Sequence, residues 1–369
     1  MKGEALLAAV EQAGLTGRGG AAFSTATKVR AALDQRAELI VNACDGELGA
    51  GKDAFVVERH LAQVVHGAGL VGGAGIRFAA HRGTHTEANL LRAGLDVLSV
   101  PHRYVSSEES SLVSLANGGL ARPLTKQVPV VFGACDANGR KLPETVVLNA
   151  ETVLRIAQIE QRGPAWFRSF GTFEEPGPRL ATIDGAVFAA GIIETAAGVA
   201  VEQLIRAAGG ATGPVSGVGV GGLSGGWLTP DEAQGAIWSR AGLAAYQISP
   251  GPGTVRVLGG DGCPLAHVSD VLQYAAGESA GQCGPCMFGI PALAEDMRLL
   301  RQCSLDRVGG QRLGRRLELL PGRGACRFPD GVAGYARSAL RAFAGEVSSH
   351  LAGTCTTDAA SRSSHVVCI

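Results

Sequence analysis

Three cysteines in the last third of the chain have a spacing that suits metal chemistry. Cys283 and Cys286 form a Cys-Gly-Pro-Cys motif, and Cys326 follows within Gly-Ala-Cys-Arg-Phe-Pro-Asp. A C-x-x-C loop brings two thiolates within reach of one metal centre, and its glycine and proline leave backbone N–H groups available to the sulfurs. The motif by itself is also compatible with a zinc site or a redox pair. Three thiolates from two segments favour an iron–sulfur cluster over a disulfide.

A glycine-rich loop near the start of the chain is a second candidate. It reads Gly-Arg-Gly-Gly-Ala-Ala-Phe over residues 17–23, and a helical pattern over 24–33 follows it. Such a loop exposes backbone N–H groups to an anion, and the dipole of the helix adds to the attraction. Arg18 and Lys28 would add positive charge. Taken alone, a flexible glycine turn between two helices explains the pattern equally well.

Polar residues follow a short apolar segment that reads as a strand. Residues 38–42 would deliver Asn42, Asp45 and Glu47 to the carboxyl end of that strand. Open α/β sheets bind their ligands at this end of the strands. The adjacent acids at 108–109 are, without further context, typical of a helix start that the helix dipole favours.

Composition and charge exclude several classes of protein. The 369 residues are 46% hydrophobic, and 33 basic residues balance 33 acidic ones. This balance gives no reason to expect nucleic acid or an anionic membrane as a partner. The uncharged stretch 207–230 is glycine-rich and contains Pro214, so we expect no insertion into a membrane. Nine cysteines without a regular framework, and no visible secretory signal, predict a protein of the reducing cytoplasm.

The elements that would position these side chains change in type along the chain. Strands and helices alternate in the first part, which predicts an α/β layer with a largely parallel sheet. Short paired strands and a helix that ends at two glycines follow, and the region after them shows mainly helical periodicity. The expected strands are 38–42, 76–80, 180–185, 191–194 and 215–220, and the expected helices are 6–13, 24–33, 52–74, 86–98, 201–208, 271–276, 291–300 and 332–343.

Several of these motifs together resemble one family. Glu-Ser-Ala-Gly-Gln-Cys-Gly-Pro-Cys at 278–286 resembles the cluster loop of the NADH-binding flavoprotein subunit of respiratory complex I. The same loop occurs in the related subunits of NAD-dependent hydrogenases and formate dehydrogenases. The glycine loop with Lys28, and Gly-Pro-Ala-Trp-Phe at 163–167, are similar to motifs of the same family. The resemblance spans roughly residues 4 to 347.

The resemblance implies a layout of three domains and a tail. A Rossmann-like FMN- and NADH-binding α/β domain would occupy residues 1–170. A ubiquitin-like β-grasp domain of the SLBB type would occupy 171–260. A helical bundle that binds the iron–sulfur cluster would occupy 261–350, and a polar tail would occupy 351–369.

The resemblance also implies the roles of individual residues. The phosphate side of FMN would be held by the loop and the basic residues near it, namely Gly17, Arg18, Gly19, Gly20 and Lys28. The flavin ring and ribityl chain would be fixed by Asn42, Asp45, Tyr104, Glu108 and Asn149. The nicotinamide side would be lined by Phe23, with Glu47 and Glu109 as the catalytic acids. The cluster would be bound by Cys283, Cys286 and Cys326.

The sequence departs from the family at positions that matter for these roles. Ala280 stands where the first cluster cysteine would be. Ser279, Cys303, a tail cysteine (Cys355 or Cys368), water or a partner's side chain could complete the site, or the cluster could be 3Fe-4S in place of 4Fe-4S, or lost.

Further departures fall in the flavin pocket. Cys44 replaces an acid, and we expect it to be a small buried residue. Ser107 replaces a glycine, which would narrow the space in which flavin and nicotinamide stack. Leu148 replaces an asparagine, and the aromatic platform expected near 125–130 is absent.

Two functions from different classes follow. The first is an electron-transfer oxidoreductase subunit resembling NADH dehydrogenase, which passes electrons between NAD(P)H or another donor, FMN and the cluster. Its partner would be a ferredoxin-like or other electron-transfer subunit, in the cytoplasm or peripheral to a membrane complex. The second is a degenerate, non-catalytic homologue that serves as a scaffold or binds a partner.

Overall fold

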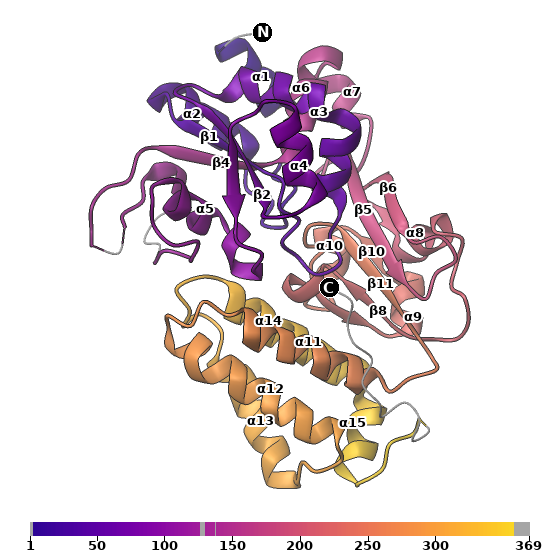
Figure 1. The fold of residues 1–369 in the computed structure, drawn as a ribbon. Coiled ribbons are helices and arrows are strands. Elements are labelled where there is room, and N and C mark those ends of the chain that lie inside the picture. The colour runs from indigo at the N-terminus through magenta and orange to yellow at the C-terminus, as the bar shows by residue number, and fades with distance from the viewer. Residues whose placement is uncertain (1–2, 126–129, 137, 358–369) are drawn as a thin grey trace. The chain divides into compact units, whose positions relative to one another are not determined.

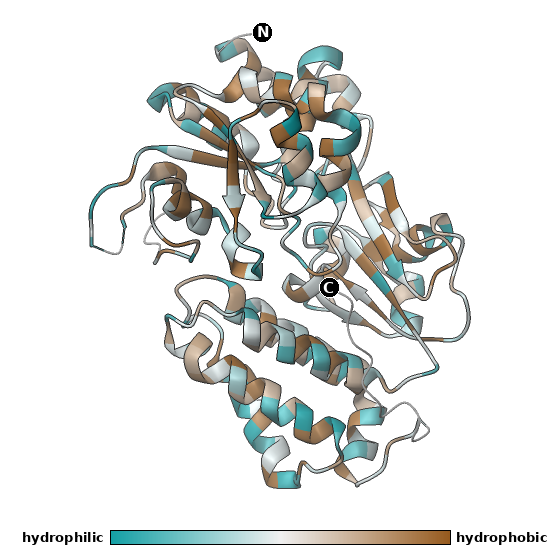
Figure 2. Cartoon of the chain, viewed as in Figure 1, coloured by the Kyte–Doolittle hydropathy of each residue, from teal (hydrophilic) through white to brown (hydrophobic). Residues whose placement is uncertain are grey.

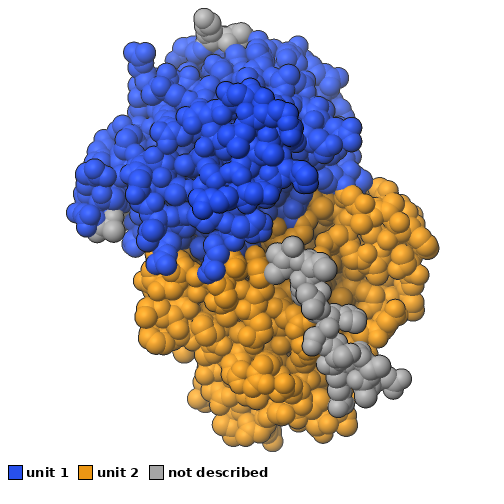
Figure 3. Space-filling model, in the orientation of Figure 1, with its two compact units in different colours: residues 1–46, 50–181, 192–198 blue, residues 47–49, 182–191, 199–369 orange. Residues whose placement is uncertain are grey.

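The computed structural model describes residues 3–125, 130–136 and 138–357. The chain divides into two compact units, which Figure 3 shows in different colours. Unit 1 comprises Met1–Gly46, Ala50–Ala181 and Ile192–Gly198. Unit 2 comprises Glu47–Gly49, Thr182–Gly191 and Val199–Ile369.

Unit 1 is built on a four-stranded sheet in the order β3-β2-β1-β4 (Figure 1), in which every neighbouring pair is parallel. Its central strand β1 carries Leu39, Ile40 and Val41, none of which is exposed. Continuous apolar runs of this kind are typical of parallel strands covered on both faces, and Figure 2 shows the strands as largely hydrophobic. The strands are β1 (Glu38–Asn42), β2 (Ile76–His81), β3 (Val97–Val100) and β4 (Thr145–Asn149).

Helices connect and cover these strands. The two longest, α3 and α6, pack closely at Gly67, where a Cβ atom would lie 2.4 Å from the carbonyl oxygen of Val153. The helices of unit 1 are α1 (Glu4–Ala13), α2 (Thr25–Gln35), α3 (Lys52–Val71), α4 (His85–Arg92), α5 (Glu109–Ala116), α6 (Ala150–Arg162) and α7 (Pro164–Arg168), with short 3₁₀ turns η1 (Tyr104–Ser107) and η2 (Val130–Phe132).

One predicted helix is too long. The helix expected over 86–98 ends at Arg92, and the last part of that range belongs to strand β3. Gly94 has a φ of 72°, which is left-handed backbone that ends a helix. Beyond it, Val97 and Leu98 pair in parallel with Phe78 and Ala79 of β2, so sheet pairing decides their conformation.

The first part of unit 2 is a mixed sheet. The carboxyl half of β5 pairs in parallel with β11, which pairs antiparallel with β8, and β8 in turn pairs antiparallel with β9. Strands β7 and β10 form a separate antiparallel pair. Strand β5 (Pro178–Gly185) begins in unit 1, and β6 (Gly191–Ala196) belongs to unit 1 except for its first residue. The other elements are β7 (Val199–Ala200), α8 (Val201–Ala207), β8 (Val215–Val220), η3 (Gly222–Ser224), β9 (Gly226–Leu228), α9 (Pro230–Gly235), β10 (Ile237–Trp238), α10 (Arg240–Ala244) and β11 (Thr254–Gly259).

The second part of unit 2 is a group of helices (Figure 1). Trp227 of β9 is 1% exposed and packs against Tyr335 and Phe343, with ring centroids 6.0 and 5.3 Å away. This contact joins the helices to the mixed sheet. The helices are α11 (Pro264–Glu278), the π-helical turn η4 (Pro285–Gly289), α12 (Ile290–Arg301), α13 (Arg307–Leu319), α14 (Phe328–Ala342) and α15 (Ala344–Leu351).

The predicted class, α/β with a parallel sheet and a mainly helical carboxyl-terminal part, is confirmed. Strands β1 and β8 have the predicted bounds. Strands β3, β4 and β11 and helices α6, α13 and α15 are among the elements that were not predicted. The domain boundaries at 170, 260 and 350 stay predictions. Within the described residues, no helix is both long and apolar enough to span a membrane.

Replacing Gly67 by alanine should destabilise unit 1 by about 1–3 kcal/mol, because the new methyl group would press on the backbone of α6. The matched control is Gly69→Ala in the same helix, where a Cβ atom meets nothing within 4 Å. That change should be neutral or stabilise by about 0.5–1 kcal/mol, as expected for a helix interior. Urea unfolding of both variants measures the difference. Equal stabilities would contradict the close α3–α6 contact.

Candidate functional site

The carboxyl ends of β1 and β4 form the edge at which the predicted flavin residues of unit 1 gather. Asn42 and Asn149 end these two strands and are direct partners in the register. In the sheet, β2 lies on one side of β1 and β4 lies on the other side. The strand order therefore reverses between β1 and β4. The glycine loop reaches this edge, since a Cβ atom on Gly19 would lie 2.3 Å from Oδ1 of Asn149.

Lys28 lies at the same edge, between three elements. Its ammonium donates to Oε1 of Glu109 at 2.6 Å and to the carbonyl oxygen of Val147 at 2.9 Å. The ring of Phe23 is 5.8 Å away, measured to its centroid. The Lys28 side chain is 16% exposed and that of Glu109 is 26% exposed. Phe23 and Lys28 from one predicted segment therefore lie near Glu109, which is 81 positions after Lys28.

Asn42 uses both ends of its side chain to hold neighbouring backbone. Its Nδ2 donates to the carbonyl oxygen of Ser107 at 3.0 Å, and its Oδ1 accepts from the N–H of Cys44 at 3.1 Å. Cys44 is buried, and burial raises the pKa of its thiol well above the usual value. The expectation that Cys44 is a small buried residue is confirmed.

Asp45 caps the long helix α3. Its two carboxylate oxygens accept from the N–H groups of Asp53 and Ala54, at 3.0 and 2.7 Å. Burial, and then the charge of Asp53, raise the pKa of Asp45 to about 7. The geometry thus assigns Asp45 a structural role, and its predicted contact with the flavin stays a prediction.

The loop before α5 carries three more predicted positions. Glu108 accepts from the N–H of Ser110 at 2.9 Å and caps α5, as the pattern of acids at a helix start predicts. Tyr104 begins the turn η1, and its carbonyl oxygen accepts from Oγ of Ser107 at 3.2 Å. A Cβ atom on Gly46 would lie 1.9 Å from that Oγ, so the serine side chain fills the space beside Gly46.

Arg18 is turned toward the interior of unit 1. Its guanidinium donates to the carbonyl oxygens of Pro176 and Pro178 at 3.0 and 3.3 Å, and its own N–H donates to Oγ1 of Thr152 at 3.0 Å. Burial, followed by the charge of Arg179, lowers the pKa of Arg18 to about 9. Its side chain therefore fixes the glycine loop to the main chain, and its predicted contact with a phosphate stays a prediction.

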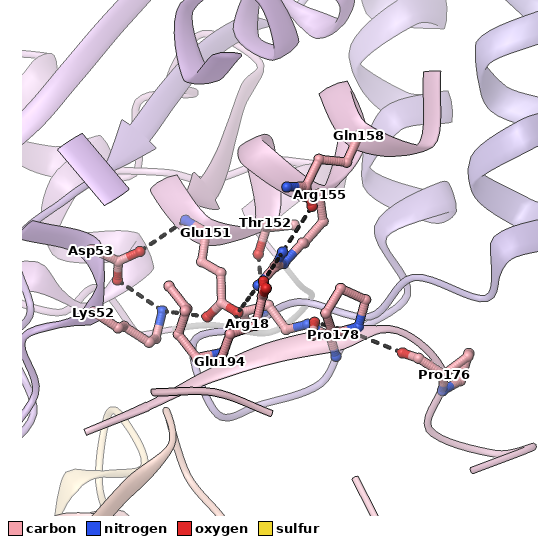
Figure 4. A network of polar contacts seen from close by, with 11 residues as sticks. Arg18, Lys52, Asp53, Glu151, Thr152, Arg155, Gln158, Pro176, Pro178 and Glu194 are labelled. Atoms are coloured by element: carbon pink, nitrogen blue, oxygen red, sulfur yellow. Dashed lines mark hydrogen bonds and ion pairs between the residues drawn. The ribbon is translucent and has the colours of Figure 1, made fainter. Parts of the chain in front are cut away.

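Next to Arg18 lies a buried charge network that sequence reasoning missed (Figure 4). Lys52 begins α3, is 1% exposed, and pairs with Asp53 at 3.0 Å and with Glu151 of α6 at 3.2 Å. Asp53 accepts from the N–H of Glu151 at 2.9 Å, and Glu151 accepts from the N–H of Leu180 at 2.8 Å. Burial raises the pKa of Glu151, but the positive charges of Lys52 and then Arg155 outweigh this effect. The pKa of Glu151 is therefore lowered.

Glu47, the other predicted catalytic acid, belongs to unit 2. Its carboxylate accepts from the N–H groups of Leu223 and Ser224 at 2.8 and 3.2 Å. A Cβ atom on Gly222 would lie 2.5 Å from Oε1 of Glu47, so only glycine permits this approach. The carboxylate is thereby held by the backbone of the turn η3.

The three predicted cluster cysteines come together in unit 2. Burial, followed by the neighbouring Cys283 and Cys326, raises the pKa of the Cys286 thiol to about 11. The N–H of Ala280 donates to the Cys286 sulfur and partly offsets this shift. Within the described residues, their sulfurs do not fall among the ligand sets whose atoms all lie within 4.8 Å of one another. Thiolates as the only ligands are typical of an iron–sulfur cluster.

The structure sorts the predicted candidates for a fourth ligand. Ser279 is adjacent, and its hydroxyl donates to the carbonyl oxygen of Cys286 at 3.4 Å. Cys303 follows the far end of α12, whose 12 residues make it about 18 Å long. Cys355 contacts Glu346 at 3.4 Å in a different group of side chains. Cys303 and Cys355 are therefore excluded as the fourth ligand of the cluster in this structure. Cys368 lies outside the described residues.

Comparisons with known proteins agree with these two sites. Residues 10–158 match the family model of the Nuo51 FMN-binding domain, and residues 266–350 match that of the NADH-ubiquinone oxidoreductase-F iron-sulfur binding region. The chain is similar to a subunit of the NADH-quinone oxidoreductase of Rhizobium meliloti (strain 1021), with 27% identity over 93% of this chain and 87% of that protein. It is also 27% identical to NADP-reducing hydrogenase subunit HndC of Solidesulfovibrio fructosivorans, over 93% of this chain and 75% of that one.

Among solved structures, an NAD⁺-reducing [NiFe]-hydrogenase in the air-oxidised state matches with a TM-score of 0.84 and 29% identity. The match covers 96% of this chain, which spans 63% of the hydrogenase chain. The fold and sites define an electron-transfer oxidoreductase subunit with a flavin domain and an iron–sulfur region. These matches confirm the predicted resemblance to the NADH-binding flavoprotein subunits of NADH-quinone oxidoreductases. The predicted cofactors, FMN and an iron–sulfur cluster, are those of the matched family models.

Glu151→Gln should destabilise unit 1 by about 3–5 kcal/mol, because Lys52 would lose one of its two anionic partners inside the protein. The matched control is Glu160→Gln in the same helix, whose side chain is 19% exposed and pairs with His66. We expect that change to cost less than about 1 kcal/mol. Chemical unfolding of the two variants decides the matter, and a small effect at Glu151 would show that the network is dispensable.

Ala280→Cys should raise the iron and sulfide content of anaerobically purified protein. The backbone of Ala280 already contacts Cys286, and a thiol there would add the ligand that the family loop has. Gly277→Cys, which adds a thiol into open space on α11, is the control. Iron and sulfide analysis with EPR spectroscopy measures the effect. An unchanged cluster would mean that another group already occupies this position.

Proposed function

We propose that this chain is an NADH-dehydrogenase-like subunit that takes electrons from a nicotinamide nucleotide and delivers them singly to a partner protein. The observation that carries the proposal is the assembly of Phe23, Lys28, Glu109 and Asn149 at one sheet edge of unit 1. Bound there, FMN would accept a hydride and give up electrons one at a time, and the cluster would accept them in unit 2.

The donor set of unit 1 fits an anionic cofactor. Lys28 is a partly buried cation at the strand edge where α/β sheets bind ligands, and the glycine loop beside it leaves room where any other side chain would collide with Asn149. In the proposed complex Lys28 binds the phosphate side of FMN. Its present partner Glu109 then becomes available to face the nicotinamide. Phe23, whose ring centroid is 5.8 Å from the Lys28 ammonium, lines the nicotinamide side.

The donor set of unit 2 fits a cluster with three cysteine ligands. Cys283, Cys286 and Cys326 supply the thiolates, and the N–H of Ala280 supplies a hydrogen bond to one of them. Hydrogen bonds to sulfur tune the reduction potential of such a cluster. Since Ala280 cannot coordinate, we propose that Ser279, water or a partner's side chain completes the site, or that the cluster holds three irons.

The finer assignments of fold and partner belong to the same proposal. The parallel order β3-β2-β1-β4 supports a Rossmann-like FMN domain, and the mixed sheet with α8 supports a β-grasp domain of the SLBB type. The relatives are named as subunits of oxidoreductases and hydrogenases, which supports a ferredoxin-like or other electron-transfer subunit as the acceptor. We propose that the complex works in the cytoplasm, free or peripheral to a membrane.

Anaerobic purification of the full chain tests the function. We expect a yellow-brown protein that releases FMN on acid treatment, contains iron and sulfide, and is bleached by NADH. A coloured protein that only another reductant bleaches would retain the cofactors and change the donor. A colourless, metal-free but folded protein would overturn the proposal and favour the alternative, a non-catalytic scaffold.

Lys28→Met should weaken FMN binding by about 10–100-fold, because a charge-assisted hydrogen bond of about 1.5–3 kcal/mol would be lost. The control is Lys141→Met, which removes a lysine that is 69% exposed and paired with Glu144. Flavin fluorescence titration of deflavinated protein gives the dissociation constants. If both variants bind FMN as tightly as the unmodified chain, Lys28 does not hold the cofactor.

A further inference from the structure

A second group of metal-ligating side chains lies in unit 2, apart from the cysteine loop. Cys263, Glu346, His350 and Cys355 each offer one ligand atom, and these atoms all lie within 4.8 Å of one another. No motif identifies them in the sequence, because Cys263 and His350 are 87 positions apart. Cys263 and Cys355 also lie just outside residues 266–350, which match the iron–sulfur family model.

The spacing of the four atoms is that of a single tetrahedral ion. The Cys263 sulfur is 3.5 Å from Nε2 of His350 and 3.8 Å from Oε1 of Glu346. The Cys355 sulfur is 3.4 Å from Oε1 of Glu346. Nε2 of His350 is 2.9 Å from the same Oε1. Zinc bonds of about 2.0–2.3 Å in tetrahedral geometry separate ligand atoms by about 3.3–3.8 Å. Of these four distances, the one between Nε2 and Oε1 is shorter than that range, by a few tenths of an ångström.

The neighbours of these ligands orient them in the way metal sites require. Nδ1 of His350 lies 2.9 Å from the carbonyl oxygen of Leu300, which can only accept, so Nδ1 carries the proton. In a neutral imidazole Nε2 then presents its lone pair to the centre of the group. The carboxylate of Glu346 is held by the N–H of Thr356 at 3.1 Å and by the Thr356 hydroxyl. Such outer contacts fix the ligands of protein metal sites.

The ligand group is buried, and buried charges are stable only when they are paired or coordinate a metal. The His350 side chain is 0% exposed, that of Glu346 is 8% exposed, and Cys263 is 7% exposed. The lone pair of Nε2 would otherwise face a carboxylate oxygen at 2.9 Å, so a proton or a metal ion must lie between them. Two sulfur ligands with one nitrogen and one oxygen suit Zn²⁺ better than the hard ions Mg²⁺ or Ca²⁺.

We propose that Cys263, Glu346, His350 and Cys355 bind one structural zinc ion. The site has four protein ligands and so leaves no open position for catalysis. Cys263 immediately precedes α11, Glu346 and His350 are on α15, and Cys355 follows α15. The ion therefore fastens the beginning of the helical group to its end. Because α11 has 15 residues, the zinc site lies about 22 Å along this helix from the cysteine loop.

Metal analysis of the full chain tests the proposal without reference to FMN or to electron transfer. Protein purified with zinc present and dialysed against a weak chelator should retain about one zinc per chain. Cys263→Ser combined with Cys355→Ser should abolish the zinc. Cys283→Ser combined with Cys286→Ser should lose iron and keep the zinc, and Cys135→Ser, which removes an exposed cysteine, should change neither metal.

Two further measurements keep the proposal testable if the double serine variant fails to fold. Cobalt added to the zinc-free chain should give the thiolate charge-transfer and tetrahedral ligand-field bands of a Cys₂ site, also in the Cys283→Ser and Cys286→Ser variant. Thr356→Val, which keeps all four ligands, should weaken zinc affinity by about 10–100-fold. Zinc should raise the melting temperature of the chain by roughly several degrees.

Three results would overturn the proposal. One is a chain that retains no zinc. Another is zinc that disappears with Cys283 and Cys286, which would place it in the cysteine loop. The third is a disulfide between Cys263 and Cys355, detected by thiol counting under native conditions, which would leave His350 and Glu346 as a buried ion pair.

Discussion

The packing of α3 and α6 in unit 1 depends on the buried positive charge of Lys52. Lys52 is almost without solvent contact, and it must be neutralised where α3 and α6 begin. Asp53 and Glu151 do this, and each also accepts a backbone N–H, which ties the two helix starts to each other and to Leu180. A buried ion pair adds little net stability, but it penalises any structure that separates its members. The network therefore fixes the helices that follow β1 and β4, the strands whose ends form the flavin site.

The helical part of unit 2 contains two groups of metal-ligating side chains that differ in ligand type and in place. Cys283, Cys286 and Cys326 offer thiolates alone, which suit a cluster of several irons. The group around His350 is compact and has mixed ligands, which suits a single ion. One chain can bind both a cluster and a single ion without the two metals exchanging sites. Helix α11 separates the two groups, and a set of thiolates prefers a different metal from a set of mixed ligands.

Many elements of the fold could be predicted from local patterns, but β4 and α6 were not. The apolar run of β1 and the glycines that end α8 act within a few residues, so their bounds followed from the sequence. Strand β3 did not, since Val97 and Leu98 continue a helical pattern and become a strand only by pairing with β2. Strand β11 likewise exists because β5 and β8 lie on either side of it. Such pairing energies involve residues far apart in the chain and leave little local signal.

The sequence by itself indicated the family and the two cofactors, because each rests on residue types at short, fixed spacing, and the cysteines of the loop stay predicted ligands. Only the tertiary structure decided what the polar side chains do. Arg18 had the pattern of a phosphate ligand, yet burial turned its guanidinium toward backbone carbonyls. Lys52, Glu151 and the ligands around His350 left no motif, because contacts between distant segments bring them together. A side chain's partners depend on which surfaces pack against it, and that is a property of the folded chain.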